Sequence, residues 1–469
     1  MAAVIDTSLT SERAPPAASV SDAAGVPLVV ALEGTLLRAN PLVEALVRLA
    51  CSRPLEAARI ALWGWSGQKP LSQAVADRGL LDVDSLPLDA DMLEHMRDEK
   101  ARGRKVFLAS HADKTIADAV AARLGFVDGV LAAQENSPGD GRREMLIRRF
   151  GEKGFDYVGS PNDGSVASAV RPGRPITAAT IARALRLHQW VKNLLLFVPL
   201  VLGGMAGNYP IVLRVVLCFV AFGLLASTMY LVNDIVDVAD DRRHHLNKDR
   251  PVASGDLPTR VAGWMILLGL ALGLGTAAML GWPLFFAFAG YAAMSLAYSV
   301  ALKRIPILDV STLAGFYAWR LVIGILAAHV EPSSWLLMFA LAFFLSLSLA
   351  KRYTEIARID ALAAAPVIGR GYRSGDSQFL MMLGVASGAS SILIFVLYLI
   401  HGAFEAAYFT EPQALWICPP IFFLWLCRIW LLSGRGELHD DPVIFSLRDP
   451  VSLFLGALAA GAVLIALVA

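Results

Sequence analysis

The pattern of hydrophobic and polar positions divides the chain at about residue 175. Before that point, short apolar runs at 26–32 and 105–110 are each followed by a helix-like segment, which predicts a soluble α/β unit. After it, nine apolar stretches approach the length of about 20 helical residues that crosses a bilayer core of about 30 Å. We expect these spans near residues 190–207, 212–232, 261–280, 282–301, 306–328, 334–350, 379–401, 414–433 and 450–468.

A linker rich in Pro, Gly and Arg, RPGRPITA at 171–178, marks the change of character. We therefore expect a tail at 1–25, an α/β domain at 26–172 and a mainly α-helical membrane domain at 173–469. The tail is rich in Ala, Ser and Pro and lacks the apolar core of a signal peptide, so we expect it to be disordered and to stay in the cytosol.

Lys and Arg collect at alternate connections, before the first span and after the second, fourth, sixth and eighth. The remaining connections, around Asn208, Trp282, 329–332 and 402–413, contain neither residue type. The positive-inside rule then predicts an integral protein of the cytoplasmic membrane, with its charged loops and N-terminal domain in the cytosol. Nine spans would place the C-terminus outside.

Composition agrees with a membrane protein. Only 17% of the 469 residues are charged, whereas soluble domains average about 25%. The net charge of +1 argues against a nucleic-acid partner, because phosphate-backbone binding needs a concentrated basic surface. The four cysteines form no CxxC pair, so neither a disulfide framework nor a zinc site is indicated.

The stretch YLVNDIVDVADDRRHHLNKDRPVASGD, residues 230–256, brings several carboxylates to the edge of the second span. If the helix continues, Asn233, Asp237 and Asp241 present one oxygen ligand per turn, and Asp234 and Asp240 flank that row. Clustered carboxylates repel unless a cation lies among them, and hard oxygen ligands favour Mg²⁺ or Mn²⁺. This acidic row therefore predicts a metal site.

Basic residues follow the acidic row. Arg242, Arg243, Lys248 and Arg250 could bind the phosphate oxygens of a substrate. The alternative is that they pair with the aspartates at a solvated helix end, or anchor the loop on the cytosolic side of the membrane.

A second group of polar residues, in YSVALKRIPILDV, joins the fourth and fifth spans. Tyr298, Lys303 and Arg304 could hold a leaving group, and Asp309 could supply a ligand from the opposite side of the bundle. Arg320 lies in the middle of the fifth span, where a charge facing lipid is costly. We expect it to point inward and bind a phosphate or pair with Asp309.

The chain resembles the UbiA superfamily of intramembrane prenyltransferases. The matching features are Asn233-x-x-x-Asp237-x-x-x-Asp241, the RPVASG that follows at 250–255, and the segment from Tyr298 through Lys303 to Asp309. The resemblance implies nine transmembrane helices around a central cavity. It also implies that the acidic motifs bind Mg²⁺ and the diphosphate of a donor whose C–O bond ionises.

Three further segments are similar to the decaprenyl-phosphate phosphoribosyltransferase-like branch of that superfamily: RLHQWVKN (186–193), AKRYTE (350–355) and RGELHDDPVIFSLRDPVS (435–452). One departure from the aromatic prenyltransferases points the same way. Many of those enzymes have a second aspartate four positions after the first in their second motif, where this chain has Leu313.

The resemblance leaves three functions open, of which we expect the first and keep the other two as alternatives. A phosphoribosyltransferase would join 5-phosphoribosyl diphosphate (PRPP) to a polyprenyl phosphate and release pyrophosphate. An aromatic prenyltransferase would use a polyprenyl diphosphate and an aromatic acceptor, and a non-catalytic carrier would only move a polyprenyl phosphate. A homo-oligomer is compatible with each. The basic residues Lys192, Lys351, Arg352 and Arg358 exceed the need of one diphosphate, which favours two phosphorylated substrates, although each is also an ordinary cytosolic anchor.

The segment VPLVVALEGTLLRAN (26–40) resembles the first motif of haloacid dehalogenase (HAD) phosphatases. On that pattern the nucleophile position is Ala31 and the second acid is Glu33. Ser110 and Asp163 occupy later motif positions. Because alanine cannot form an aspartyl-phosphate, we expect a degenerate phosphatase fold without that chemistry.

Overall fold

A computed structural model describes most of the chain: residues 25–40, 83–110, 114–132, 146–159 without 153, 169–170, 176–243, 247–361, 371–404 without 374, 406, 408–438, 441–468, and seven single positions between 43 and 59. Residues 1–24 of the predicted tail, and Asp163, lie outside them. The chain forms two compact units. They comprise Met1–Leu37 with Leu88–Gly173, and Arg38–Pro87 with Arg174–Ala469.

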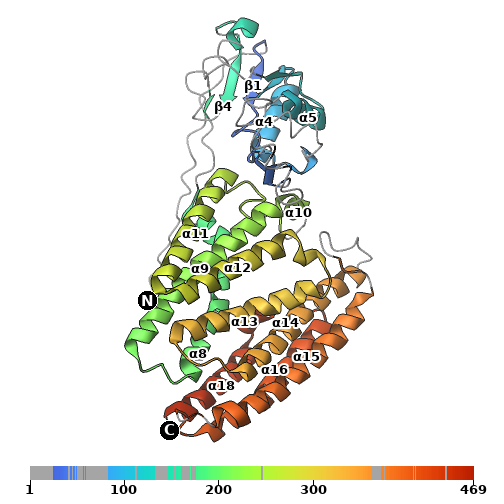
Figure 1. Cartoon of the computed structure of the whole chain (residues 1–469). Coiled ribbons are helices and arrows are strands. Elements are labelled where there is room, and N and C mark those ends of the chain that lie inside the picture. Colours follow the sequence, from blue (N-terminus) through green and yellow to red (C-terminus); the bar gives the residue numbers. More distant parts are fainter. Residues whose placement is uncertain are drawn as a thin grey trace, which may run out of the picture. The chain divides into compact units, whose positions relative to one another are not determined.

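The first unit is built on a parallel five-stranded sheet in the order β3-β2-β1-β4-β5, of which β1 and β4 are labelled in Figure 1. Its strands are β1 (Leu28–Ala31), β2 (Val106–Ser110), β3 (Gly129–Ala132), β4 (Asp156–Gly159) and β5 (Ala169–Val170), and its longer described helices are α4 (Ala90–Ala101) and α5 (Lys114–Leu124). Every residue of β1 and β2 is buried, which explains why these strands read as continuous apolar runs. The predicted α/β fold of this region is confirmed, whereas the compact unit leaves out Arg38–Pro87, which lie within the predicted bounds 26–172.

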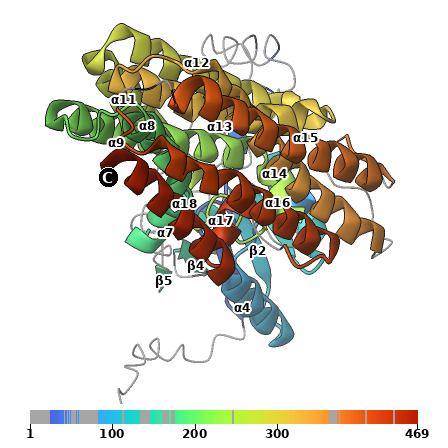
Figure 2. The same ribbon diagram turned by 90° about the horizontal axis from the view of Figure 1, so that it is seen from below.

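The second unit consists of helices (Figures 1 and 2). Its long helices are α9 (Tyr209–Val236), α11 (Thr259–Leu280), α12 (Trp282–Val300), α13 (Leu308–Ala328), α14 (Ser334–Ala361), α15 (Asp376–Tyr398), α16 (Cys418–Gly434) and α18 (Pro450–Val468). Its shorter elements are η1 (Val83–Ser85), α7 (Ala178–Ala184), η3 (Leu187–Leu196), α8 (Phe197–Leu202), α10 (Val238–Arg243), η4 (Leu302–Arg304), η5 (Leu399–Ala403), η6 (Pro412–Ile417) and α17 (Pro442–Ser446).

Within the described residues, eight helices are long and apolar enough to cross a membrane, against nine predicted spans. The first predicted span is the shorter apolar segment Leu187–Leu202. Ten of its residues form the 3-10 helix η3, which rises about 2.0 Å per residue rather than 1.5 Å, so the segment reaches up to about 29 Å. Because each residue of a 3-10 helix advances further along the axis, these 16 residues reach nearly the length of a full span.

Helices α9 and α11 pack closely because small residues of α11 face α9. A Cβ on Gly269 would lie 2.0 Å from the Thr228 side-chain oxygen, and one on Gly273 would lie 3.1 Å from Leu225. Small residues let membrane helices approach until their backbones are nearly in contact. This packing supports the part of α9 that leads to the acidic row.

Replacing Gly269 by Ala should therefore destabilise the protein by about 1–3 kcal/mol, because the added methyl group overpacks the contact with Thr228. Gly275 of the same helix has open space at its Cβ position, and Gly275→Ala is the matched control. It should be neutral or stabilising by up to about 1 kcal/mol. Thermal unfolding of the two purified variants in detergent measures the difference, and equal melting temperatures would contradict this packing.

Candidate functional site

The acidic row lies where α9 passes into α10. Asp237 separates the two helices, yet its amide donates to the Asn233 carbonyl (2.9 Å), and the Asp241 amide donates to the Asp237 carbonyl (2.8 Å). The helical hydrogen-bond pattern thus continues through the break. Asn233, Asp237 and Asp241 are therefore spaced one helical turn apart, as predicted, and their role as ligands stays a prediction.

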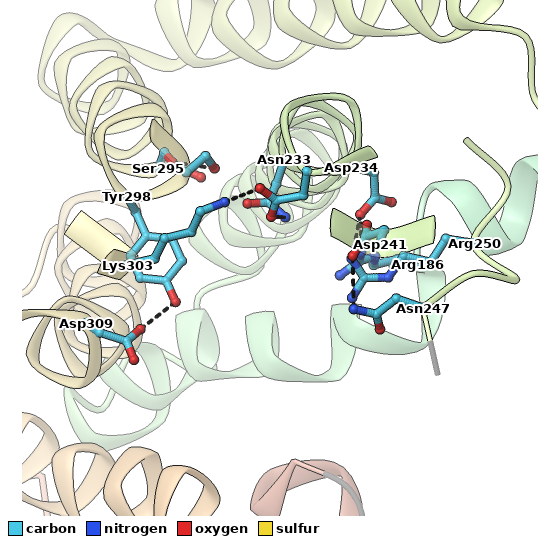
Figure 3. A network of polar contacts seen from close by, with 12 residues as sticks. Arg186, Asn233, Asp234, Asp241, Asn247, Arg250, Ser295, Tyr298, Lys303 and Asp309 are labelled. Carbon is cyan, nitrogen blue, oxygen red and sulfur yellow. Dashed lines mark hydrogen bonds and ion pairs between the residues drawn. The ribbon is translucent and has the colours of Figure 1, made fainter. Parts of the chain in front are cut away.

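The first half of the row is joined to η4 through Lys303. The Asn233 amide donates to Asp237 Oδ2 (3.1 Å), and the Lys303 ammonium forms an ion pair with Asp237. Figure 3 shows Lys303 extending from its own helix toward Asn233. Lys303 is buried, so it is part of the site and not merely a membrane anchor.

The second half of the row is surrounded by different cations. Arg250 lies 2.7 Å from Asp241 and 3.3 Å from Asp234, and Arg186 forms an ion pair with Asp234. Asn247 donates to Asp241 Oδ1 (2.9 Å). These residues cluster on the side of α9 away from Lys303 (Figure 3). Burial raises the pKa of Asp241 to about 6, although Arg250 acts in the opposite direction.

Arg186 was not among the residues predicted for the site. It belongs to the RLHQWVKN segment quoted for the family resemblance, and it precedes η3 with a left-handed backbone, at φ 49°. Its guanidinium also lies 5.1 Å from the centre of the Tyr230 ring. From the sequence alone, a single arginine before a span is expected to be a cytosolic membrane anchor. The ion pair of Arg186 with Asp234 and its place in the pocket lining appear only in the structure.

The donor chemistry of the row fits a hard divalent cation, since every side chain offers oxygen. The carboxylates are, however, engaged by Lys303, Arg186 and Arg250, and among the described residues no three His, Cys, Asp or Glu side chains converge as a preformed metal cluster. A bound cation would have to displace part of these ion pairs. Asn233, Asp237 and Asp241 are the residues that would hold it, with Asp234 beside them.

The remaining residues that were predicted beside the row do not share its ion pairs. Arg242 does not face a phosphate site: it holds Glu44 with two hydrogen bonds (2.8 and 2.7 Å) and donates to the Ala253 carbonyl (2.9 Å). Asp240 is half-buried, and Arg243 and Lys248 are exposed.

The second predicted group is a buried ion pair. The Tyr298 hydroxyl donates to Asp309 Oδ1 (2.8 Å), and the Arg352 guanidinium lies 2.7 Å from Asp309 Oδ2. Asp309 and Arg352 are 0% and 1% exposed, and Arg352 also forms an ion pair with Glu355. Arg352 therefore neutralises Asp309, whereas Arg352 was predicted from the sequence to bind a substrate phosphate.

The predicted pairing of Arg320 with Asp309 is wrong. Arg320 donates to Asn193 Oδ1 (2.9 Å), to the Phe316 carbonyl (2.7 Å) and to the Tyr291 hydroxyl (3.3 Å). Three aromatic rings surround its guanidinium at 5.5–5.6 Å from their centres: Phe222, Tyr291 and Tyr317. Arg320 points inward as expected, but aromatic faces and neutral oxygens hold its charge.

A polar pocket of about 590 Å³ opens beside the second half of the row. Six of its lining residues are cationic: Arg183, Arg186, Arg250, Lys351, Arg358 and Arg448. Its acidic residues are Asp249, Glu355 and Asp441. The predicted bases Arg250, Lys351 and Arg358 are therefore brought together, while Arg183 and Arg448 were not predicted.

Asp441 forms ion pairs with two lysines at the pocket. Its carboxylate lies 2.8 Å from Lys192 and 3.8 Å from Lys351. Burial alone would raise the pKa of Asp441, but Lys192 and Lys351 outweigh that effect and hold it at about 2. Lys192 is therefore paired to a carboxylate beside the pocket.

Two of the HAD-like positions, Glu33 and Ser110, are in contact. Ala31 ends β1 and is buried, and the Ser110 hydroxyl donates to Glu33 (2.5 Å). Asp163 lies outside the described residues. A HAD-like identity of this unit stays a prediction.

Acidic and basic side chains thus meet at the ends of helices that are long and apolar enough to cross a membrane. The sequence profile of the UbiA prenyltransferase family matches residues 194–447. The chain belongs to this family.

Three relatives extend the comparison. "Uncharacterized protein y4nM" of Sinorhizobium fredii is 34% identical, over 94% of this chain and 91% of that protein. "Nodulation protein NoeC" of Azorhizobium caulinodans is 30% identical, and the decaprenyl-phosphate phosphoribosyltransferase of Mycobacterium tuberculosis is 32% identical. Both of these matches cover 58% of this chain and 89% of the relative.

Lys351 and Arg352 are neighbours in sequence, but the Lys351 side chain is partly exposed at the pocket and Arg352 is buried against Asp309. Substitutions of the two residues can therefore be compared directly. Arg352→Gln should cost about 3–5 kcal/mol of stability, because Asp309 is left buried without its closest cation. The Lys351 side chain is 39% exposed, so Lys351→Gln should change stability by less than about 0.5 kcal/mol. Thermal unfolding of both variants in detergent tests this, and a stable Arg352→Gln protein would contradict the structural role of the ion pair.

Proposed function

We propose that this protein is a Mg²⁺-dependent transferase that moves 5-phosphoribosyl from PRPP to a polyprenyl phosphate and releases pyrophosphate. The observation that carries the proposal is the pocket of six cationic side chains directly beside the acidic row. The family membership and the M. tuberculosis relative support the same reaction class.

The pocket favours a donor that has phosphate groups at both ends. Arg186 and Arg250 line the pocket and also bind Asp234 in the acidic row, so a diphosphate there would lie next to the metal ligands. Lys351, Arg358 and Arg448 line it from α14 and from the segment that follows α17. PRPP has a diphosphate on C1 and a phosphate on C5 of one ribose, so its two ends match the two sets of cations, whereas a prenyl diphosphate has phosphate at one end only.

Each group of residues then has a defined task. The metal would neutralise charge on the departing pyrophosphate, with Asn233, Asp237 and Asp241 holding it. Arg186 and Arg250 would orient the diphosphate so that the C1–O bond can break while cationic character develops on C1. The lipid phosphate would then attack C1, its hydrocarbon chain remaining in the bilayer.

The distribution of Lys and Arg supports a location in the cytoplasmic membrane with the pocket facing the cytosol. PRPP is water-soluble and highly charged, so its site must be reached from water. We further propose that the N-terminal α/β unit is cytosolic and that the C-terminus lies outside.

A direct assay uses purified protein, radiolabelled PRPP, a polyprenyl phosphate and Mg²⁺, with separation of the lipid product. We expect ribosylated lipid and pyrophosphate, and loss of both products with EDTA. Formation of a prenylated aromatic product from a prenyl diphosphate and 4-hydroxybenzoate, without any ribosylated lipid, would replace this function by the aromatic prenyltransferase. Lipid phosphate binding with no product from either donor would favour a carrier.

The variants Asp237→Asn and Asp241→Asn remove one ligand charge each with little change in shape. Each should lower turnover by about 10²–10³-fold, comparable with the loss of a group that stabilises transition-state charge. Glu331→Gln, on an exposed connection away from the row, is the control and should retain wild-type turnover. Folded Asp237→Asn protein with wild-type turnover would remove the metal-site assignment.

The second set of cations in the pocket, Lys351, Arg358 and Arg448, should contribute more to PRPP binding than to pyrophosphate binding. Arg358→Gln should raise the KM for PRPP by about tenfold, corresponding to the loss of one charge-assisted hydrogen bond of about 1.4 kcal/mol. Inhibition by inorganic pyrophosphate, which needs only the Arg186 side, should be unchanged. Arg373→Gln, an exposed residue that does not line the pocket, serves as the control. An equal weakening of PRPP and pyrophosphate would contradict the division of the pocket.

A further inference from the structure

The segment Arg38–Pro87 has an unusual place in the chain. In sequence it lies between the two parts of the α/β unit, which end at Leu37 and begin again at Leu88. It nevertheless belongs to the compact unit that contains the membrane helices. Its described residues contact α10 and the loop that follows, where Asp241 and Arg250 lie. We infer that this segment is a positioning element for the acidic row, and that Glu44 is its key residue.

Helix α10 has only six residues and is joined to α9 through the break at Asp237, where the helical hydrogen bonds continue. Such a short helix is restrained by few hydrogen bonds of its own, so contacts with its surroundings add to its stability. Arg242, the neighbour of Asp241 in α10, is held by the carboxylate of Glu44 through two hydrogen bonds of 2.8 and 2.7 Å. The side chains of Arg242 and Glu44 are only 6% and 11% exposed, so little solvent screens this pair.

The same arginine ties α10 to the loop that holds Arg250. Arg242 Nε donates to the Ala253 carbonyl (2.9 Å), and from the same loop Arg250 binds Asp241 at 2.7 Å. Glu44 thus fixes a side chain that connects α10 and the loop, next to the residue that closes the acidic row. A bidentate pair restrains orientation as well as distance.

Further contacts of the segment reach the same loop and helix. Val47, three positions after Glu44, packs against the apolar cluster that includes Val238 and Val252. Gly255 has φ +78°, and a Cβ there would lie 2.5 Å from the Cβ of Arg38, so the two backbones approach closely. Asp256 lies 3.9 Å from Arg38 and 3.5 Å from Arg183, a residue that lines the pocket.

Loss of the Glu44 charge would leave Arg242 largely buried without its carboxylate, and α10 would lose a main restraint. The expected result is local: greater opening of α10, and weaker binding of a metal by the row, without loss of the bundle. The inference therefore concerns how the row is positioned, and it stands apart from the identity of the donor and the acceptor.

The test compares Glu44→Gln and Glu44→Asp with wild type in the full chain. Hydrogen–deuterium exchange of the peptide covering 238–243 should be about tenfold faster in Glu44→Gln and intermediate in Glu44→Asp, which keeps the charge on a shorter side chain. Peptides from α13 should exchange as in wild type. Mn²⁺ binding, followed by electron paramagnetic resonance without substrates, should weaken about threefold or more in the same order.

Glu94→Gln, an exposed residue of α4, is the control and should match wild type in both measurements. Unchanged exchange at 238–243 would overturn the inference, as would equally faster exchange in α13, which indicates general destabilisation. Faster exchange with unchanged Mn²⁺ affinity would overturn the link to the row. If Glu44→Gln does not fold, Glu44→Asp and Arg242→Lys are compared with wild type by the same criteria. Neither readout uses PRPP or lipid, so failure of the proposed reaction would leave this test unaffected.

Discussion

Buried carboxylates at the end of a membrane helix must be neutralised, because removing each charge from water costs several kcal/mol. Here the neutralising cations come from different parts of the bundle. Lys303 of η4 reaches Asp237, Arg186 from the turn before η3 reaches Asp234, and Arg250 from the loop after α10 reaches Asp241. Charge neutralisation at α9 and α10 thus holds three separate segments around one position, and two of them line the pocket together with α14 and residues near α17.

The same principle explains the interior of the bundle. Asp309 and Arg352 are fully buried and neutralise each other across α13 and α14. Arg320 has instead a set of aromatic faces and neutral oxygen acceptors, which disperse its charge without a carboxylate. Adjacent residues can therefore differ in role: Arg352 neutralises Asp309 inside the bundle, whereas Lys351 lines the pocket.

Much of this architecture could be predicted from the sequence, because the signals are local. Apolar length located the long helices, and 3.6-residue periodicity placed Asn233, Asp237 and Asp241 on one helical edge. The partners could not be predicted in the same way. Arg352 reads like any cytosolic anchor until α14 is packed against α13, and Glu44 pairs with Arg242 across 198 positions of sequence. The short first span depended on a 3-10 helix, whose greater rise no hydropathy pattern records.

The central claim is that the acidic row and the basic pocket together bind PRPP and a divalent cation. Its most direct test is an experimental structure of the protein with PRPP and Mn²⁺, with anomalous scattering used to locate the metal. We expect one Mn²⁺ or more coordinated by Asp237 or Asp241 and by diphosphate oxygens, with the 5-phosphate near Lys351 and Arg358. A PRPP molecule bound elsewhere, or Mn²⁺ absent from the row while PRPP fills the pocket, would contradict it.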